Sequence, residues 1–143
     1  MRQALYQGKE LEQLIPQRKP IMMVSLFFSA TDTDAETGLE ITADNIFCKE
    51  NKLTEPGLIE HIAQSAAAFA GYNAIKSSQP IVLGYIGEIK KLTISQLPLA
   101  GLFLETTLHV VSEVMNVMLI NAKSTVNGCD VAECSIKLYM DKG

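Results

Sequence analysis

The sequence has 143 residues, the length of one domain with a hydrophobic core of its own, and we expect residues 1–143 to form a single domain. Hydrophobic residues make up 48% of it and charged residues 20%, which is ordinary for a soluble globular protein. The net charge of −4 argues against a nucleic-acid-binding surface and against a basic membrane-binding surface. No apolar run is long enough to span a membrane, and the amino terminus lacks the apolar segment of a signal peptide, so we expect a cytoplasmic location.

The first third of the chain predicts a short helix followed by two strands. Residues 1–15 have the apolar spacing of an amphipathic helix, which ends before Pro16 because a residue that precedes proline avoids the helical region. Residues 20–29 form a compact apolar run of strand length, and residues 36–44 alternate apolar and polar side chains as a hairpin partner would. Residues 45–55 have no period, and we expect a loop that forms one wall of a site at the start of the next element.

Residues 56–76 predict one buried helix around which the other elements are organised. The segment is apolar nearly all round, which is typical of a helix inside a fold. Pro56 suits the first turn, where a missing N–H has no cost, and Thr54 or Glu55 can cap the helix. Small side chains mark positions where another part of the chain is expected to pack closely. They are Ala63, Ala66, Ala67, Ala68, Ala70 and Gly71.

Four strand-like segments follow the helix, at residues 81–95, 101–112, 114–126 and 129–140. Asn127 and Gly128 between the last two are a strong two-residue hairpin signal. The order of two strands, one buried helix and four strands predicts an α+β fold, with a mainly antiparallel sheet wrapped around the helix. The edges of so small a sheet need covering, so we expect a dimer in which two chains pair edge to edge.

The sequence carries no signal for a metal or an organic cofactor. Its three cysteines, Cys48, Cys129 and Cys134, form no metal-ligand or CxxC pattern, and their odd number suits reduced thiols. Cys134 alternates in phase with apolar neighbours, as a core residue does. There is no ligand cluster and no glycine-rich phosphate-binding loop, so we expect neither kind of cofactor.

Three polar residues, Glu60, His61 and Gln64, lie in the first turns of the otherwise apolar helix. Glu60 and Gln64 are four residues apart and therefore share a face. The Glu60 carboxylate lies near the positive end of the helix dipole. This placement makes Glu60 a candidate acid/base residue, while Gln64 is a candidate to orient it or to hold backbone across a dimer.

The stretches LEQLIPQRKPIMMVSL and GLIEHIAQSAAAFAGY together resemble the FabZ-type 3-hydroxyacyl-acyl-carrier-protein dehydratases. The family signature runs L-P-H-R-x-P-x-L-L-V-D, then a Gly/Pro loop, then a helix that reads roughly L-x-x-E-A-x-A-Q. The stretch GYIGEIKKLTISQLPLAGLFLETTL resembles a later family region, and the helix start is similar to that of small hotdog proteins of pigment and polyene pathways. The matching positions are Ile15, Pro16, Arg18, Pro20, Val24, Glu60, Ala63, Gln64, Pro98 and Gly101.

The resemblance implies a hotdog fold, with a long central helix wrapped by a mainly antiparallel sheet of about six strands. It also implies a reaction in which the α-proton of a 3-hydroxyacyl thioester is removed by the family histidine, while the helix glutamate assists the leaving β-hydroxyl. Here Glu60 matches the glutamate, but Gln17 stands at the histidine position and Ser25 at the position of an aspartate. Gln17 cannot accept a proton at neutral pH. General-base catalysis is worth ~10²–10⁴-fold, so a site with Gln17 should be badly impaired unless another base serves.

Other residues match positions that the resemblance implies for substrate binding. The family's loop before the helix is reduced to KENKLTEPG, which ends in Pro56 and Gly57, and Arg18 is either a paired surface arginine or a contact for an acidic carrier protein. His61 is the only histidine near the motif, so it is a candidate for a substrate contact or for the missing base. Adjacent helix positions point about 100° apart, and we therefore favour a structural or dimer-contact role for His61.

Three functions remain open from the sequence. The leading one is a dehydratase-like protein that acts on acyl chains carried as thioesters by an acyl carrier protein or coenzyme A. A homodimer would place Glu60 opposite Gln17, whereas a heterodimer with a histidine-bearing paralogue would complete one site. The second is a non-catalytic acyl-thioester-binding subunit. The third is a hotdog thioesterase in which Glu60 serves as base or nucleophile.

Overall fold

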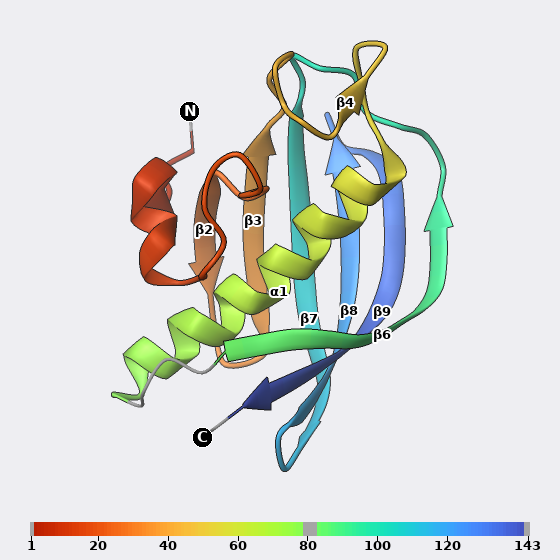
Figure 1. The fold of residues 1–143 in the computed structure, drawn as a ribbon. Helices are drawn as coiled ribbons and strands as arrows, with labels where there is room; N and C mark the ends of the chain where they lie inside the picture. Colours follow the sequence, from red (N-terminus) through yellow and green to blue (C-terminus); the bar gives the residue numbers. More distant parts are fainter. Residues whose placement is uncertain (1, 79–82, 142–143) are drawn as a thin grey trace.

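The computed structural model describes residues 2–78 and 83–141, in which a curved antiparallel sheet wraps around one long helix, α1 (Figure 1). The strand order is β1-β2-β3-β7-β8-β9-β6. The predicted α+β architecture is confirmed. The elements are β1 (Tyr6–Gln7), the 3₁₀ helix η1 (Gly8–Gln13), β2 (Leu26–Ala30), β3 (Asp34–Glu40), β4 (Cys48–Lys49), β5 (Lys52–Leu53), α1 (Glu55–Lys76), β6 (Leu83–Ile94), β7 (Phe103–Val114), β8 (Val117–Val126) and β9 (Cys129–Asp141).

The helix and the last hairpin agree with the sequence patterns. Helix α1 begins one residue before Pro56, which lies in its first turn, and ends at Lys76 as predicted. Asn127 and Gly128 have φ values of 51° and 80° and join β8 to β9, which is the geometry that an Asn-Gly hairpin turn requires. The part of the predicted strand 81–95 before residue 83 lies outside the described residues.

The helix predicted over residues 1–15 is wrong. Tyr6 and Gln7 pair with β2 as a short strand, and only residues 8–13 are helical, in 3₁₀ form. Gly8, the first residue of η1, has a φ of 56°, a left-handed conformation that a continuous right-handed helix does not contain. The apolar spacing still had a real cause, since Leu11 and Leu14 are both buried in the core.

The strand predicted over residues 20–29 begins only at Leu26. Residues 20–25 instead run as an irregular segment near α1, and side chains of α1 bind the backbone of Ile21 and Met23. The run is apolar because Met23 and Val24 are buried, and burial alone does not distinguish a strand from a loop packed under a helix. The loop predicted over residues 45–55 contains the small β4–β5 hairpin.

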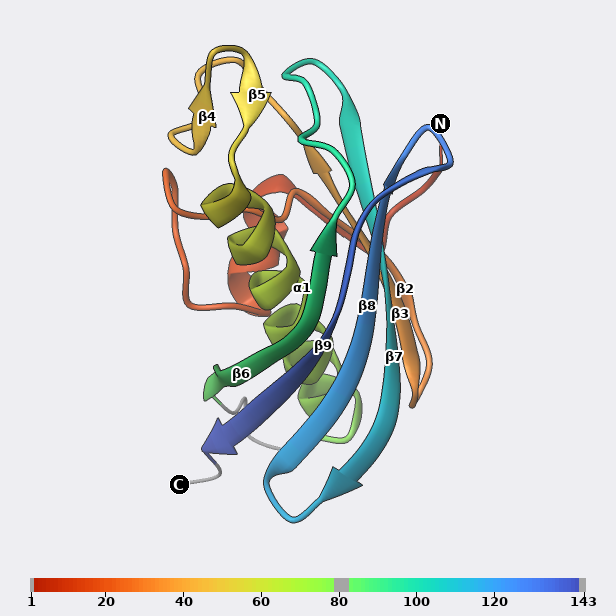
Figure 2. The same cartoon turned by 90° about the vertical axis from the view of Figure 1, so that its right-hand side faces the viewer.

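The small residues of α1 do allow a close approach, as predicted. Ala66 and Ala68 are fully buried, and the backbone of α1 at Gly71 lies directly against the carbonyl group of Leu14. Figure 2 shows α1 lying across the concave face of the sheet, with the amino-terminal segment on its other side. Among the described residues, no helix is both long enough and apolar enough to cross a membrane.

Strand β6 forms one edge of the sheet. Within the described part of the chain it pairs only with β9, so its other side is unpaired. The pairing is interrupted between Ile86 and Glu88 and again between Lys90 and Thr93, and the strand bends sharply there (Figure 1). An unpaired edge of this length is where a second chain could add a strand, and the predicted dimer stays a prediction.

Candidate functional site at the start of helix α1

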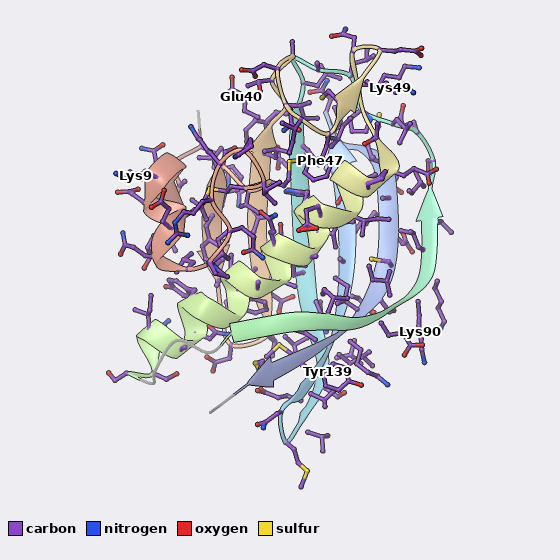
Figure 3. All side chains as sticks on the ribbon, in the orientation of Figure 1. Lys9, Glu40, Phe47, Lys49, Lys90 and Tyr139 are labelled. Carbon is purple, nitrogen blue, oxygen red and sulfur yellow. The ribbon has the colours of Figure 1, made fainter. Side chains whose placement is uncertain are left out.

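The loop before α1 packs directly onto the first turn of the helix. Thr54 occupies the N-cap position, but its hydroxyl donates to the carbonyl oxygen of Phe47 over 2.6 Å instead of capping the helix. Phe47 lies beside the start of α1, below the β4–β5 hairpin (Figure 3). A Cβ at Gly57 would lie 2.5 Å from Cβ of Phe47 and 2.7 Å from Cδ1 of Leu53, so the glycine is needed for this packing. Contact of Pro56 and Gly57 with a substrate stays a prediction.

Gln64 connects the candidate acid Glu60 to the segment that precedes β2. Its Nε2 donates to Oε1 of Glu60 over 3.2 Å and to the carbonyl oxygen of Ile21 over 2.9 Å. Its Oε1 accepts the N–H of Met23 over 2.6 Å. Gln64 is only 1% exposed, whereas Glu60 is half-buried and keeps access to its surroundings. This geometry supports the predicted role of Gln64 in orienting the Glu60 carboxylate.

His61 is fully buried, and both of its ring nitrogens are hydrogen-bonded. Nδ1 lies 2.7 Å from the carbonyl oxygen of Met23, and Nε2 lies 2.8 Å from Oγ1 of Thr106 on β7. A carbonyl oxygen only accepts, so Nδ1 carries the proton and Nε2 accepts from the Thr106 hydroxyl. Burial lowers the pKa of His61 from 6.5 to about 4, with the Met23 bond acting in the opposite direction. The lone pair of His61 is therefore engaged with Thr106 in the core, which supports the structural role and leaves His61 no free nitrogen to act as a base.

Gln17 and Arg18 lie on the turn after η1. Arg18 donates to the carbonyl oxygens of Ile15 and Gln17 over 2.7 and 2.9 Å and lies 3.3 Å from a carboxylate oxygen of Glu12, so it stabilises this turn. Oε1 of Gln17 is buried and has no hydrogen-bond partner among the described residues. A buried amide oxygen without a partner costs about 1–3 kcal/mol, which is offset when a donor from a substrate or another chain reaches it. Binding of substrate by Arg18 stays a prediction.

The contacts divide the predicted residues into two groups. Glu60, His61 and Gln64 are joined through the backbone of residues 21–23, whereas Gln17 lies on the preceding turn. Between the described residues, no hydrogen bond or ion pair connects Gln17 to Glu60. Nor do the described residues include a group of three or more His, Cys, Asp or Glu side chains placed to hold a metal ion. Within one chain, Glu60 and Gln17 are therefore not joined by any described contact.

The sequence patterns missed the polar partners of α1 on the sheet. The hydroxyl groups of Thr37 and Ser65 lie 2.8 Å apart, and those of Thr106 and Ser124 lie 2.6 Å apart. All four residues are at most 1% exposed. Thr106 had a detectable signal, because it is a polar residue in phase with Leu104 and Leu108, the apolar residues on either side of it on the inward face of the strand.

A protein-family match covers most of the chain. A family model described as ApeP-like, "ApeP dehydratase", matches residues 9–140. The chain belongs to the ApeP-like dehydratase family. The predicted resemblance to a FabZ-like dehydratase of the pigment-pathway type is confirmed by this match. No curated protein matches the sequence.

Solved structures similar to this ApeP-like chain have the hotdog fold, which confirms the predicted fold. The dehydratase heterocomplex ApeI:P from Xenorhabdus doucetiae superposes with a TM-score of 0.85 at 12% identity, covering 92% of this chain and 90% of that chain. The PaaI protein of the phenylacetic acid degradation operon of E. coli has a TM-score of 0.64 at 14% identity, covering 79% and 80%. A hypothetical thioesterase of Streptococcus pneumoniae TIGR4, solved with coenzyme A, has a TM-score of 0.64 at 8% identity, covering 80% and 84%. At these identities the likeness establishes the fold alone.

Proposed function

We propose that this ApeP-like chain supplies Glu60 to a 3-hydroxyacyl-thioester dehydratase whose histidine comes from a paralogous partner chain. The observation that carries the proposal is the contrast between Glu60 and Gln17. Glu60 is retained and held by Gln64 over 3.2 Å, whereas the histidine position is occupied by Gln17, which cannot act as a base. A chain with half of the acid/base pair needs the other half from elsewhere.

Family membership and one structural neighbour support a dehydratase formed by two different chains. The family is one of dehydratases, and the similar X. doucetiae structure is a dehydratase heterocomplex. The unpaired edge of β6 offers a place for a second hotdog chain to continue the sheet. In that arrangement Glu60 of this chain would face the partner's histidine, and Gln17 would face the partner's corresponding helix.

The proposed reaction needs two proton transfers, one from the α-carbon of the acyl chain and one to the hydroxyl group on its β-carbon. The partner's histidine takes the α-proton, and the electron pair of the C–H bond forms the new double bond. The β-carbon–oxygen bond breaks, and the carboxyl group of Glu60 gives a proton to the departing hydroxyl, which leaves as water. Gln64 keeps the carboxyl group in place by donating to Oε1, which leaves Oε2 for the substrate.

The acyl chain would be carried as a thioester, on an acyl carrier protein or on coenzyme A. Both carriers present the acyl group on a phosphopantetheine arm. The neighbour solved with coenzyme A is related to this chain by fold alone, so it does not decide between the two carriers. Purified complexes tested with both carriers would identify the substrate form.

The test is a mass-spectrometric assay of the complex formed with a histidine-bearing hotdog partner. A 3-hydroxyacyl-carrier substrate should lose one water with the complex and remain unchanged with the lone chain. Glu60→Gln in the complex should lower the rate by ~10²-fold or more, since acid catalysis is worth about that much. Glu55→Gln is the matched control, because Glu55 is exposed in the first turn of the same helix. Full activity of the Glu60→Gln complex would rule out the proposal.

The same assay separates the two other candidate functions. Release of a free thiol from the thioester by the lone chain, abolished by Glu60→Gln, would identify a thioesterase. Binding of the acyl substrate with no chemical change, in the complex as well as in the lone chain, would identify a non-catalytic binding subunit.

A further inference from the structure

Side chains of α1 hold the backbone of residues 21–23 at three points. The N–H of Met23 donates to Oε1 of Gln64 over 2.6 Å, and the carbonyl oxygen of Met23 accepts from Nδ1 of His61 over 2.7 Å. The carbonyl oxygen of Ile21 accepts from Nε2 of Gln64 over 2.9 Å. Both backbone hydrogen-bonding groups of Met23 are therefore bound by one helix, and that helix also carries Glu60.

These contacts decide which way the Gln64 amide points. Its oxygen faces the N–H of Met23, so its nitrogen must face the two acceptors, the carbonyl oxygen of Ile21 and Oε1 of Glu60. A reversed amide would place an oxygen against both acceptors and a nitrogen against an N–H donor. The position of Met23 therefore controls whether Gln64 donates to the Glu60 carboxyl group.

His61 anchors Met23 to the sheet. Its Nε2 lies 2.8 Å from Oγ1 of Thr106, which lies 2.6 Å from Oγ of Ser124. Thr106 and Ser124 are cross-strand neighbours on β7 and β8, and both are at most 1% exposed. Because Nδ1 of His61 carries the proton, its single N–H is directed at Met23, and its acceptor nitrogen takes the Thr106 hydroxyl.

We propose that His61 is a positioning residue for Glu60, acting through the Met23 backbone and the Gln64 amide. The inference rests on the proposed function, since it assigns His61 a role at the same site. The connected contacts run from Thr106 to His61, Met23, Gln64 and Glu60, with successive distances of 2.8, 2.7, 2.6 and 3.2 Å. Loss of the His61–Met23 contact frees the segment that fixes the Gln64 amide, and a misplaced catalytic group costs up to ~10²-fold in rate.

Two substitutions separate the contacts of His61. The amide nitrogen of an asparagine lies where Nδ1 lies, so His61→Asn can keep the bond to Met23 while losing Thr106. The amide of a glutamine reaches the position of Nε2, so His61→Gln can keep Thr106 while losing Met23. In the active complex we expect His61→Asn to retain kcat within ~3-fold and His61→Gln to lose ~10-fold or more in kcat with KM little changed.

A measurement on the protein itself keeps this inference separate from the proposed function. Nitrogen-15 NMR of the histidines should show His61 as the neutral Nδ1–H tautomer, and amide hydrogen exchange at Met23 should rise in His61→Gln but not in His61→Asn. An inactive wild-type complex with these signals intact would overturn the dehydratase and leave the His61–Met23 bond standing. An active complex in which both variants keep full kcat, or lose it equally, would overturn the positioning role.

Discussion

Gly71 of α1 lies against the carbonyl oxygen of Leu14 so closely that a methyl group on its Cα would overlap that oxygen. Backbone is in contact with backbone here, and neither side can move away as a flexible side chain would. Gly71→Ala should therefore lower the free energy of unfolding by about 1–3 kcal/mol, although alanine by itself favours a helix over glycine by about 1 kcal/mol. Urea denaturation measures the change, and Asn73→Ala on the same helix should stay within about 0.5 kcal/mol. A stabilised Gly71→Ala protein would show that the two segments can separate freely.

A histidine placed at position 17 should give the lone chain activity. In a homodimer of Gln17→His, each site would hold the new histidine opposite Glu60 of the second copy. We expect dehydration of a 3-hydroxyacyl thioester to rise by ~10²–10⁴-fold over the unaltered chain, the usual value of a general base. The double variant that also carries Glu60→Gln is the control and should remain at background. An unaltered lone chain that already dehydrates at full rate would contradict the role assigned to Gln17.

His61 should make the fold sensitive to mild acid. Its pKa is about 4 in the folded protein and 6.5 in the reference state, so the folded protein keeps it neutral where the unfolded chain is protonated. Stability is then complete above pH 6.5 and falls as the pH drops towards 4, by about 3 kcal/mol in total. Denaturation between pH 7 and pH 4 measures this slope, and His61→Asn should remove it. An equal slope in that variant would assign the effect to other groups.

Asp34 should affect stability at a lower pH than His61 does. Its pKa is lowered by the hydrogen bond from Thr33 and then by that from His109. A lowered carboxyl pKa adds stability that is present above the ordinary value of 3.8 and is lost as the pH falls further. Replacement of Asp34 by asparagine should therefore remove a contribution to stability that is lost only as the pH falls below about 3.8.

Strand β6 should become protected when a second chain binds. Its outer edge is unpaired by any described residue, so the backbone N–H groups on that edge exchange freely in a monomer. Hydrogen exchange with mass spectrometry should show slower exchange in β6 as protein concentration or partner concentration rises. Protection confined to β1, at the opposite edge, would place the interface elsewhere.

The sequence predicted the elements whose signals are local and periodic. The buried helix, the Asn127–Gly128 turn and the last strands follow from apolar spacing and turn chemistry, and they lie within a few residues of their predicted bounds. The amino-terminal segment failed because its apolar residues contact the core from a 3₁₀ turn and a loop. Apolar spacing reports burial, and it does not report which backbone conformation delivers the side chain.

The candidate site divides in the same way. Glu60 and Gln64 could be paired from their spacing on one helix face, and the structure brings them to 3.2 Å. The engagement of His61 with Met23 and Thr106 joins residues 38 and 45 positions apart in the chain, which no local pattern encodes. The buried oxygen of Gln17 has no hydrogen-bond partner among the described residues, and no local sequence pattern signals that.

The buried hydroxyl groups of Thr37, Ser65, Thr106 and Ser124 help to determine the rotation and position of α1 on the sheet. A helix that is apolar on nearly every side gains similar hydrophobic burial at several rotations and shifts, so burial alone leaves its setting poorly determined. If α1 moved by one turn, Phe69 would take the place of Ser65 opposite Thr37, and the threonine hydroxyl would lose its partner. Each such loss costs about 1–3 kcal/mol. The hydrogen bonds of these threonines and serines thus favour one rotation and position of α1 on the sheet. The orientation of Glu60 follows from that position.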